Sequence, residues 1–267
     1  MEKQHLLDKF LIELRTTTEL SDLDVLFNQF VRDLGFDYSV YIIISSLDIT
    51  PEDRMRLVLS HHPGEWTDHY LKHNFLSHDR AFVEAFRSTL PFIWDDVKAR
   101  GDLTKREQKI YDDAAMFGVN YGISVPIHGA DGEVAFVTAS SGATEDDHKA
   151  ALAKTKHTLH VASTYFHERI RELGFIKNPL ERINPSDRER DCICWASRGK
   201  TAWETGQILG ISENTVNTHI KTVMKKLNVN NRQEMIAKAV AYNIVMPHDP
   251  DTMNLETPFA KRGRTNA

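Results

Sequence analysis

The sequence predicts an α+β protein of two domains, an N-terminal α-β-α sandwich with a mostly antiparallel sheet and a C-terminal all-α domain of four helices. The chain has 267 residues, 41% of them hydrophobic, which is enough for two ordinary cores. Strand and helix patterns alternate in the first two thirds of the chain, and only helical patterns follow. We therefore expect domains at 1–174 and 185–246, a linker at 175–184, and a disordered polar tail at 247–267.

The first domain is expected to begin with two amphipathic helices. HLLDKFLIEL (5–14) and LDVLFNQFVRDL (23–34) have hydrophobic residues at helical spacing, and Gly35 ends the second helix. Strands are predicted where β-branched and aromatic residues dominate, at 38–45, at 56–62 and at 122–140, where two strands meet in a hairpin through Ala130-Asp131-Gly132. Further helices are predicted at 64–75, 79–88, 104–118 and 145–173. This order indicates one sheet with helices on its faces.

The second domain has its own capping signals. Capping boxes, in which a hydroxyl residue and a glutamate three positions later cap the same helix end, begin its first two helices at Ser186–Glu189 and Thr201–Glu204. A tight turn, Gly210-Ile211-Ser212, precedes the third helix at 213–227, and the fourth helix is predicted at 232–245. Four short helices with tight connections therefore make up this domain.

Charge is distributed unevenly along the chain. Lys plus Arg against Asp plus Glu count 20 and 28 over residues 1–177, 10 and 7 over 178–246, and 3 and 3 beyond, which gives net charges of −8, +3 and 0. A small positive module on an acidic body is expected where one end of a protein contacts a polyanion. No hydrophobic run approaches the roughly 20 residues that span a bilayer, and the start has no signal-peptide core. We expect a cytoplasmic protein without a membrane partner.

The two cysteines, Cys192 and Cys194, lie two residues apart in a predicted helix, where their side chains diverge. A reducing compartment also disfavours a bridge between them. We expect no disulfide.

A short helix, a tight glycine turn and a longer helix are typical of the helix-turn-helix motif, whose second helix enters a DNA major groove. On the longer helix the hydrophobic residues recur at helical intervals and should face the core. Its polar residues then face outward, namely Asn214, Asn217, Thr218, Lys221 and Lys225. Asn and Lys can read base edges or hold phosphates, so the pattern favours DNA binding. The alternative is the solvated face of an ordinary helical hairpin.

The stretch GKTAWETGQILGISENTVNTHIKTVMKKLNVNNRQE closely resembles the DNA-binding domain of the LuxR family. The resemblance implies a four-helix domain that binds a palindromic DNA element as a homodimer, with the third helix in the groove and the fourth at the dimer contact. Asn217 and Lys221 match positions from which family members commonly contact bases, whereas Lys225 and Lys226 should lie nearer the phosphates. The candidate DNA-binding residues are thus Thr201, Asn214, Thr215, Asn217, Thr218, Lys221 and Lys225.

This sequence departs from the LuxR pattern at Thr205 and Gly206, where the family usually has Ile and Ala. Both positions lie in the second helix of the domain. The departure predicts looser packing of that helix without a change in its role.

A phosphoacceptor receiver fits the first domain poorly, because receivers consist of alternating βα units and this chain begins with two helices. The stretches HHPGEWTDHYLKHNFLSHDRAF, LPFIWDDV and NYGISVPIHG instead resemble the acyl-homoserine-lactone-binding domain of quorum-sensing LuxR-family regulators. The family's Trp, Tyr, Asp, Trp and Gly have counterparts, at the family's own intervals of 4, 9, 15 and 28 residues, in Trp66, Tyr70, Asp79, Trp94 and Gly122. The resemblance implies a ligand-responsive transcriptional regulator, not an enzyme, whose signal is an N-acyl-homoserine lactone autoinducer and which needs no cofactor.

Such a lactone offers carbonyl oxygens, one amide N–H and an apolar chain, so its pocket needs fixed donors, one strong acceptor and an apolar tunnel. Asp79 would accept the amide N–H in a charge-assisted bond, and the Trp66 indole would donate to the lactone carbonyl. Tyr70 would donate to the acyl carbonyl or form a wall of the acyl tunnel. Thr138, on the last predicted strand, would add a hydroxyl, directly or through water.

Trp94 would pack over the lactone, and Gly122 would permit close backbone approach. Two residues depart from the family pattern, His62 in place of its Tyr and Arg80 in place of its Pro. His62 is shorter than tyrosine and its protonation depends on pH, so its contact with the acyl carbonyl is in doubt. An ion pair of Arg80 with Asp79 would compete for the oxygen that binds the amide.

Each of these residues also has a purely structural interpretation. The three aromatic side chains are of types that often pack in cores. Asp79 is placed to cap a helix that begins at Ala81, and Thr138 is a good strand former that needs no ligand.

Two other functions stay open. The first retains the DNA-binding output and replaces the lactone with another small molecule, or with none. The second, more remote, is a metal-dependent hydrolase fused to a DNA-binding domain. It is suggested by a dense group of possible ligands, namely His61, His62, His69, His73, His78 and Asp79, although no second set of ligands follows downstream.

Overall fold

The computed structural model describes residues 2–46, 56–129, 132–142, 144–176, 183–242 and 244–245. Its contacts divide the chain into two compact units, Met1–Asn178 and Pro179–Ala267. Most of the linker predicted at 175–184, the tail predicted at 247–267, and the hairpin residues Ala130 and Asp131 lie outside the described residues.

A five-stranded antiparallel sheet forms the centre of the first unit, with strand order β2-β1-β5-β4-β3. The strands are β1 (Tyr38–Ser45), β2 (Leu59–Ser60), β3 (Phe92–Ile93), β4 (Tyr121–His128) and β5 (Val134–Ser141). Every residue of β5 is buried, because this strand lies in the middle of the sheet and helices cover both faces.

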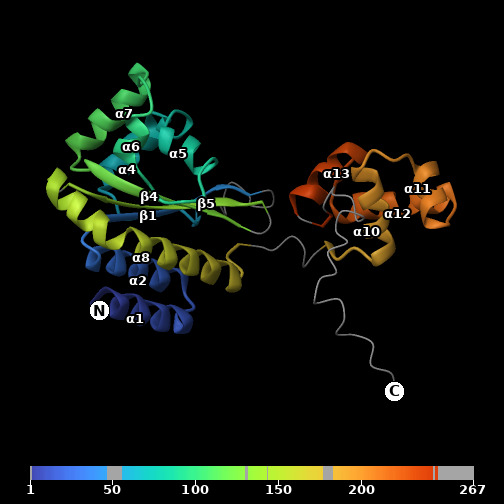
Figure 1. Cartoon of the computed structure of the whole chain (residues 1–267), viewed down its shortest axis with the longest axis horizontal. Coiled ribbons are helices and arrows are strands. Elements are labelled where there is room, and N and C mark those ends of the chain that lie inside the picture. Colours follow the sequence, from blue (N-terminus) through green and yellow to red (C-terminus); the bar gives the residue numbers. More distant parts are fainter. Residues whose placement is uncertain are drawn as a thin grey trace. The chain divides into compact units, whose positions relative to one another are not determined.

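Helices form a layer on each face of this sheet (Figure 1). One layer consists of α1 (Glu2–Thr16), α2 (Leu20–Asp33) and α8 (Glu145–Glu172). The other consists of α4 (Gly64–Lys72), the 3-10 helix η1 (Phe75–Ser77), α5 (Arg80–Ala85), α6 (Trp94–Lys98) and α7 (Lys105–Met116). The predicted α-β-α sandwich with an antiparallel sheet is confirmed.

The main core of this unit lies between the sheet and the first helical layer. Phe27 of α2 stacks on Phe166 of α8 with ring centroids 4.3 Å apart, and Tyr41 and Ile43 of β1 are buried in the same cluster. Because side chains alternate along a strand, Val40 and Ile42 face the opposite layer. The second face of the sheet therefore carries a separate set of side chains, and these position the site.

Several predicted elements have different lengths in the structure. The helix predicted at 64–75 ends at Lys72, because Asn74 adopts the left-handed conformation with φ of 50° and a 3-10 turn follows. The helix predicted at 79–88 ends at Ala85, and the strand predicted at 56–62 pairs only through Leu59 and Ser60. Strand β3 and helix α6, at 92–98, were not predicted.

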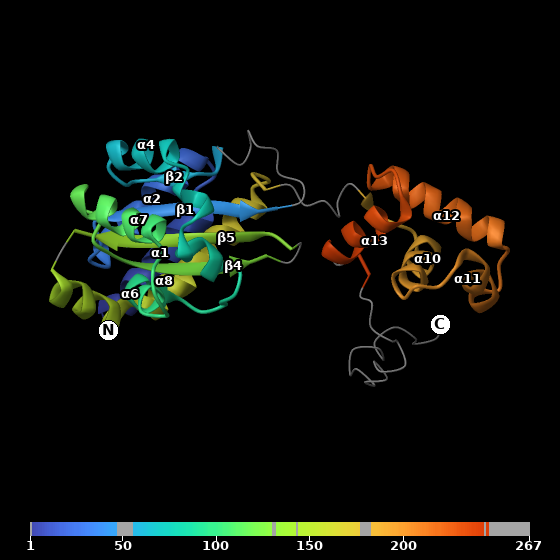
Figure 2. The same ribbon diagram turned by 90° about the horizontal axis from the view of Figure 1, so that it is seen from above.

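The second unit contains α10 (Asp187–Ser197), α11 (Ala202–Leu209), α12 (Glu213–Lys226) and α13 (Arg232–Ala241). Both predicted capping boxes are present, and Gly210 ends α11 in the left-handed conformation with φ of 65°. Figure 2 shows α12 as the longest helix of this unit, beside α10 and α11. The predicted four-helix domain with a helix-turn-helix is confirmed.

The looser packing predicted from Thr205 and Gly206 is wrong. Thr205 is fully buried, and its hydroxyl donates to the Thr201 carbonyl oxygen at 2.8 Å. At Gly206 a Cβ atom would lie 2.7 Å from the carbonyl oxygen of Ile211, so the turn packs closely against the glycine. The glycine permits a closer approach than the alanine usual in the family.

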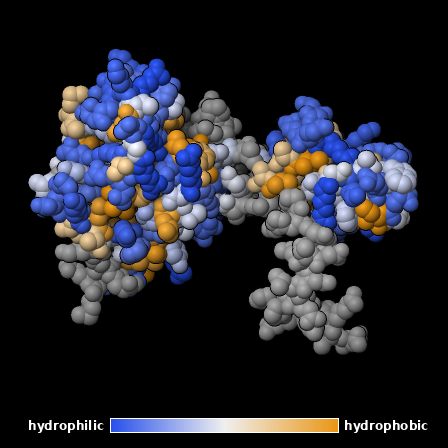
Figure 3. Space-filling view, turned by 45° about the horizontal axis from the view of Figure 1, so that its top comes forward, coloured by the Kyte–Doolittle hydropathy of each residue, from blue (hydrophilic) through white to orange (hydrophobic). Residues whose placement is uncertain are grey.

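None of the helices in the described ranges is long and apolar enough to cross a membrane. On the face shown in Figure 3, hydrophilic residues predominate and hydrophobic residues lie in separate small groups. Cys192 and Cys194 are both free thiols, and burial raises the pKa of Cys192.

Candidate functional site

A cavity of about 200 Å³ lies between the sheet and the layer formed by α4, α5 and α7. Its wall is mostly apolar, with contributions from Val40 of β1, Phe136 of β5 and Ile110 of α7. Six of the seven predicted ligand-binding residues line it, namely His62, Trp66, Tyr70, Asp79, Trp94 and Thr138. Gly122 does not line the cavity. An apolar cavity with a few convergent polar groups is the usual form of a small-molecule site.

Asp79 is the acidic residue of the cavity wall. Its Oδ1 accepts the backbone N–H of Ala81 at 2.8 Å and so caps α5, as the structural interpretation predicted, although the helix begins at Arg80. Its Oδ2 accepts the hydroxyl of Tyr70 at 2.9 Å. Burial raises the pKa of Asp79, and these two hydrogen bonds act in the opposite direction. The carboxylate has lone pairs left for one further donor.

Trp66 and Tyr70 lie one helical turn apart on α4 and face the cavity together. Their rings meet edge to face with centroids 5.5 Å apart, and Trp66 is 4% exposed. The Trp66 indole N–H has no hydrogen-bond acceptor within the described part of the chain, so this donor is free to bind a ligand. Burial, with the neighbouring Asp79, raises the pKa of Tyr70 well above its usual value and keeps the phenol a donor.

A chain of hydrogen bonds crosses the floor of the cavity. Trp94 donates from Nε1 to Ser124 Oγ at 3.1 Å, and Ser124 Oγ lies 2.9 Å from Thr138 Oγ1. Ser124 and Thr138 are paired residues on β4 and β5, so the strand register brings the two hydroxyls together. Gly122 is required by the same arrangement, because a Cβ atom there would lie 2.5 Å from Cε2 of Trp94. Because Gly122 has no side chain, the Trp94 indole can pack directly against the backbone of β4.

His62 lies at the edge of the cavity and bonds to the protein itself. Its Nε2 is 2.8 Å from Ser140 Oγ on β5, and its ring meets Tyr38 edge to face. Burial lowers the pKa of His62 to about 4, so the ring is neutral at neutral pH. A neutral ring offers one donor and one acceptor, and Ser140 uses one of them.

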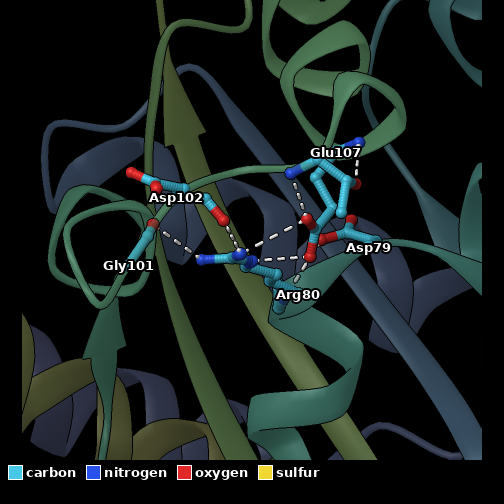
Figure 4. A network of polar contacts seen from close by, with 7 residues as sticks. Asp79, Arg80, Gly101, Asp102 and Glu107 are labelled. Atoms are coloured by element: carbon cyan, nitrogen blue, oxygen red, sulfur yellow. Dashed lines mark hydrogen bonds and ion pairs between the residues drawn. The ribbon is translucent and has the colours of Figure 1, made fainter.

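Arg80 does not pair with Asp79. Its guanidinium forms an ion pair with Glu107 of α7 and also donates to the carbonyl oxygens of Gly101 and Asp102 (Figure 4). The hydrogen bond from Arg80 lowers the pKa of Glu107 to about 2. Arg80 therefore does not compete with a ligand for the Asp79 carboxylate, as the sequence had suggested it would. It instead connects α5 to the start of α7.

The histidine-rich stretch does not assemble a metal site. Across the described residues no group of three or more His, Cys, Asp or Glu side chains is placed to hold a metal ion. The histidines bond to separate partners, His61 to Asp24, His69 to Asp113 and His78 to Arg106. Because these histidines lie apart from one another, the hydrolase alternative has no metal site among the described residues.

On α12, Val216, Ile220 and Val223 are buried, as predicted. The predicted DNA-binding residues of this helix lie on its other side, and Asn214, Thr215, Thr218, Lys221 and Lys225 are exposed while Asn217 is half-buried. Two of their hydroxyls are used within the domain, since Thr215 bonds to Ser212 and Thr218 donates to the Asn214 carbonyl oxygen. Asn217, Lys221 and Lys225 have side chains without partners among the described residues.

Two further residues have structural roles. Thr201 caps α11 and accepts the N–H of Glu204. Lys226 was expected near the phosphates. In the structure its Nζ instead forms an ion pair with Glu189 of α10 at 2.6 Å. Although burial alone would raise the pKa of Glu189, Lys226 and the N–H of Ser186 outweigh it and lower this pKa.

Comparison with protein families decides the identity of both units. An autoinducer binding domain is matched by residues 20–170, and the luxR family of bacterial regulatory proteins is matched by residues 186–239. The chain belongs to the LuxR family of autoinducer-binding transcriptional regulators. Its members are regulators and not enzymes.

LuxR-type relatives match most of the chain. The transcriptional activator protein AhyR of Aeromonas hydrophila is 31% identical over 255 residues, which cover 92% of this chain and 94% of AhyR. The quorum sensing-dependent transcriptional regulator RpaR of Rhodopseudomonas palustris is 33% identical over 183 residues, covering 68% and 72%.

Two solved structures share the fold. Escherichia coli SdiA superposes with a TM-score of 0.68 at 21% identity and covers 90% of this chain and 98% of its own. CepR2 of Burkholderia cenocepacia, an N-acylhomoserine lactone dependent LuxR family transcription factor, has a TM-score of 0.51 at 21% identity and covers 64% and 99%.

Sequence reasoning missed three residues of this LuxR-type cavity region. Ser124 connects Trp94 to Thr138, Ser140 holds His62, and Tyr111 of α7 lines the wall. The period of two in Tyr121–His128 places Ser124 on the same face as Gly122, so strand alternation was a usable signal for it. Tyr111 gave no such signal, because one face of α7 meets the cavity only once the helical layer is assembled.

Proposed function

We propose that this LuxR-family chain is a cytoplasmic homodimeric transcription regulator that binds an N-acyl-homoserine lactone in the cavity of its first unit and palindromic DNA through α12. The observation that carries the proposal is the cavity itself. The Asp79 carboxylate, the Trp66 indole N–H and the Tyr70 phenol lie together in the wall of a mostly apolar cavity. This set of groups matches the amide N–H, the carbonyl oxygens and the alkyl chain of such a lactone.

Each polar group has a specific part. Asp79 accepts the amide N–H, Trp66 donates to the lactone carbonyl, and Tyr70 stands beside Asp79 to donate to the acyl carbonyl or to hold the carboxylate. Thr138 offers its hydroxyl from the floor of the cavity. Trp94 packs over the lactone ring, where Gly122 and Ser124 fix its indole. His62 is occupied by Ser140 and contributes to the wall.

A second ligand class is favoured by one observation. SdiA, which shares this fold at 22% identity, has been solved in complex with octanoyl-rac-glycerol. An acylglycerol has an acyl carbonyl and an alkyl chain but no amide N–H. It would therefore leave the Asp79 carboxylate without its ligand donor.

Native mass spectrometry of the full chain, purified after expression with and without a panel of lactones and octanoylglycerol, tests the proposal. We expect one lactone to be retained per chain, and a dimer mass for the complex. Retention of octanoylglycerol in preference to every lactone would support the second ligand class. Retention of neither would contradict a small-molecule signal of this kind.

For the output, the exposed polar face of α12 is the proposed DNA surface. Asn217 and Lys221 lie one turn apart, neither with a side-chain partner within the described ranges, and Asn214 and Lys225 extend the same face by one turn on either side. Thr201 is the N-cap of α11 and Thr215 lies in the first turn of α12, where hydroxyl and backbone groups commonly bind phosphates, and Thr218 follows Asn217 on α12.

A further inference from the structure

The cavity changes from polar to apolar along the strands of the sheet. Across one row, Thr138 of β5 is paired with Val40 of β1 and with Ser124 of β4, and this row carries the hydroxyl groups. Two residues before Thr138 on β5, Phe136 is paired with Ile42 of β1. Because side chains alternate, both rows face the cavity, and the hydroxyl row is followed directly by an apolar row.

The apolar row is closed by a second aromatic ring from the helical layer. Phe82 of α5 meets Phe136 edge to face, with ring centroids 4.8 Å apart and an interplanar angle of 76°. Both rings line the cavity and both are buried, Phe82 at 9% and Phe136 at 5% exposure. Ala85 is buried in the same cluster, and Ile44 packs against it from the next position on β1. Two packed aromatic rings therefore stand in the cavity wall beside the apolar row.

We propose, on the basis of the proposed function, that Phe82 and Phe136 are the residues that limit acyl chain length and that they select a short-chain signal. The cavity volume of about 200 Å³ is below the roughly 300–1,000 Å³ usual for ligand pockets. The two rows of β5 are about 6.6–6.8 Å apart, and an extended chain covers this distance in about six bonds. An acyl chain that starts at Thr138 thus reaches the rings after about six carbons.

The cavity wall has one other place where a longer chain would leave. Leu71 of α4 and Leu76 of η1 line the cavity and are 54% and 40% exposed, so the wall opens to solvent between them. If the acyl chain ran toward this opening, the two phenylalanines would not limit its length. The experiment distinguishes these two directions.

Affinities of the full-length protein for a series of unbranched N-acyl-homoserine lactones, from butanoyl to dodecanoyl, test the proposal. The wild type should bind the butanoyl and hexanoyl members most tightly and lose affinity progressively from the octanoyl to the dodecanoyl member. Phe82→Ala should raise the ratio of dodecanoyl to butanoyl affinity by about tenfold, the effect of roughly two additional buried methylene groups. Phe136→Leu should move the same ratio in the same direction by less. Phe86→Ala, a control at the exposed end of α5, should keep the wild-type ratio.

The ratio of two affinities is measured within each folded variant, so a loss of stability does not imitate the effect. A wild type that binds dodecanoyl lactone as tightly as the short members would overturn the proposal, and so would an unchanged ratio in both phenylalanine variants. Loss of only the long-chain affinities in Leu71→Glu would then show that the chain leaves through the opening. A wild type that binds no lactone at all would instead contradict the proposed function.

Discussion

Asp79 has one observed role and one proposed role, and these make different demands on its carboxylate. Its Oδ1 caps α5, which requires an acceptor but no charge, and its position in the cavity wall supplies a strong acceptor for a ligand N–H. Burial raises the pKa of Asp79 because the charged form is poorly solvated there. A ligand N–H would favour the charged form, so binding should weaken as pH falls through this raised pKa.

The substitution Asp79→Asn separates these tasks. Asparagine caps helices as well as aspartate does, so the variant should fold and α5 should persist. Loss of a charge-assisted hydrogen bond costs about 1.5–3 kcal/mol, and lactone affinity should fall by roughly tenfold to a hundredfold. Isothermal titration calorimetry on the folded protein measures this loss. The control Asp95→Asn, in the first turn of α6 and outside the cavity wall, should bind normally. Wild-type affinity in Asp79→Asn would remove Asp79 from the site.

His62 should make the unliganded protein sensitive to mild acid. Its pKa is about 4 in the folded protein and about 6.5 in the unfolded chain, so the folded state favours the neutral ring. The stability from this difference is complete above pH 6.5 and is lost as the pH falls toward 4, which amounts to about 1–2 kcal/mol between pH 7 and pH 5. Urea unfolding at both pH values should show this loss in the wild type.

His62→Gln, which cannot titrate, should lose less stability over the same interval. The exposed control His5→Gln should retain the wild-type pH dependence. Equal pH dependence in the wild type and in His62→Gln would show that His62 is not the group responsible.

Helix α12 is expected to contact base edges near its middle and phosphates near its C-terminal end. Asn217 is proposed to read a base edge, so Asn217→Ala should cost about 1–3 kcal/mol on cognate DNA and little on scrambled DNA. Fluorescence anisotropy titrations with both DNAs measure the two affinities. An equal loss on both would mean that the reading face has been assigned wrongly.

Lys225 and Lys226 are adjacent in the sequence but differ in their surroundings. Lys225 is exposed and has no partner in the part of the chain that the structure describes, and Lys225→Ala should weaken binding to all DNA about equally and reduce the salt slope by about 1. Lys226→Ala should instead destabilise the domain by about 1–3 kcal/mol, because it leaves the buried Glu189 without its cation. Denaturant unfolding and salt-dependent DNA titrations of both variants separate these effects. A salt slope reduced equally in both variants would contradict the assignment.

Long periodic elements were predictable from the sequence, and short ones were not. The pattern of α8 and the capping box at Thr104 placed two helices to within a residue or two of their observed bounds. By contrast, β3 has two residues and α6 has five, which is too short for either periodicity to register. These segments form because the sheet and the helical layer position them.

The site shows the same division. The spacing of Trp66, Tyr70, Asp79 and Trp94 along the chain was enough to predict that they share one site, and all four line the cavity. The contact of Ser124 with Thr138 depends on which residues of β4 and β5 face each other, and spacing along one strand does not give that register. The direction of Arg80 was equally hidden, because its partner Glu107 belongs to a different helix.

The whole molecule carries a cavity for a small molecule in its first unit and a proposed DNA-binding surface in its second. A ligand that binds only the folded state stabilises it by an amount that grows with the logarithm of the ligand concentration relative to the dissociation constant. The Trp66 indole lines the cavity, and its N–H has no acceptor among the described residues, so we expect the protein to gain stability when the correct signal is present.

The melting temperature of the full-length protein with each lactone of the panel tests this claim most directly. A lactone at 100 times its dissociation constant should add about 2.7 kcal/mol, which corresponds to a rise of roughly 5–10 °C for a domain of this size. The same lactone should produce a much smaller rise in Asp79→Asn. No change in melting temperature with any lactone, or an equal rise in Asp79→Asn, would contradict the account.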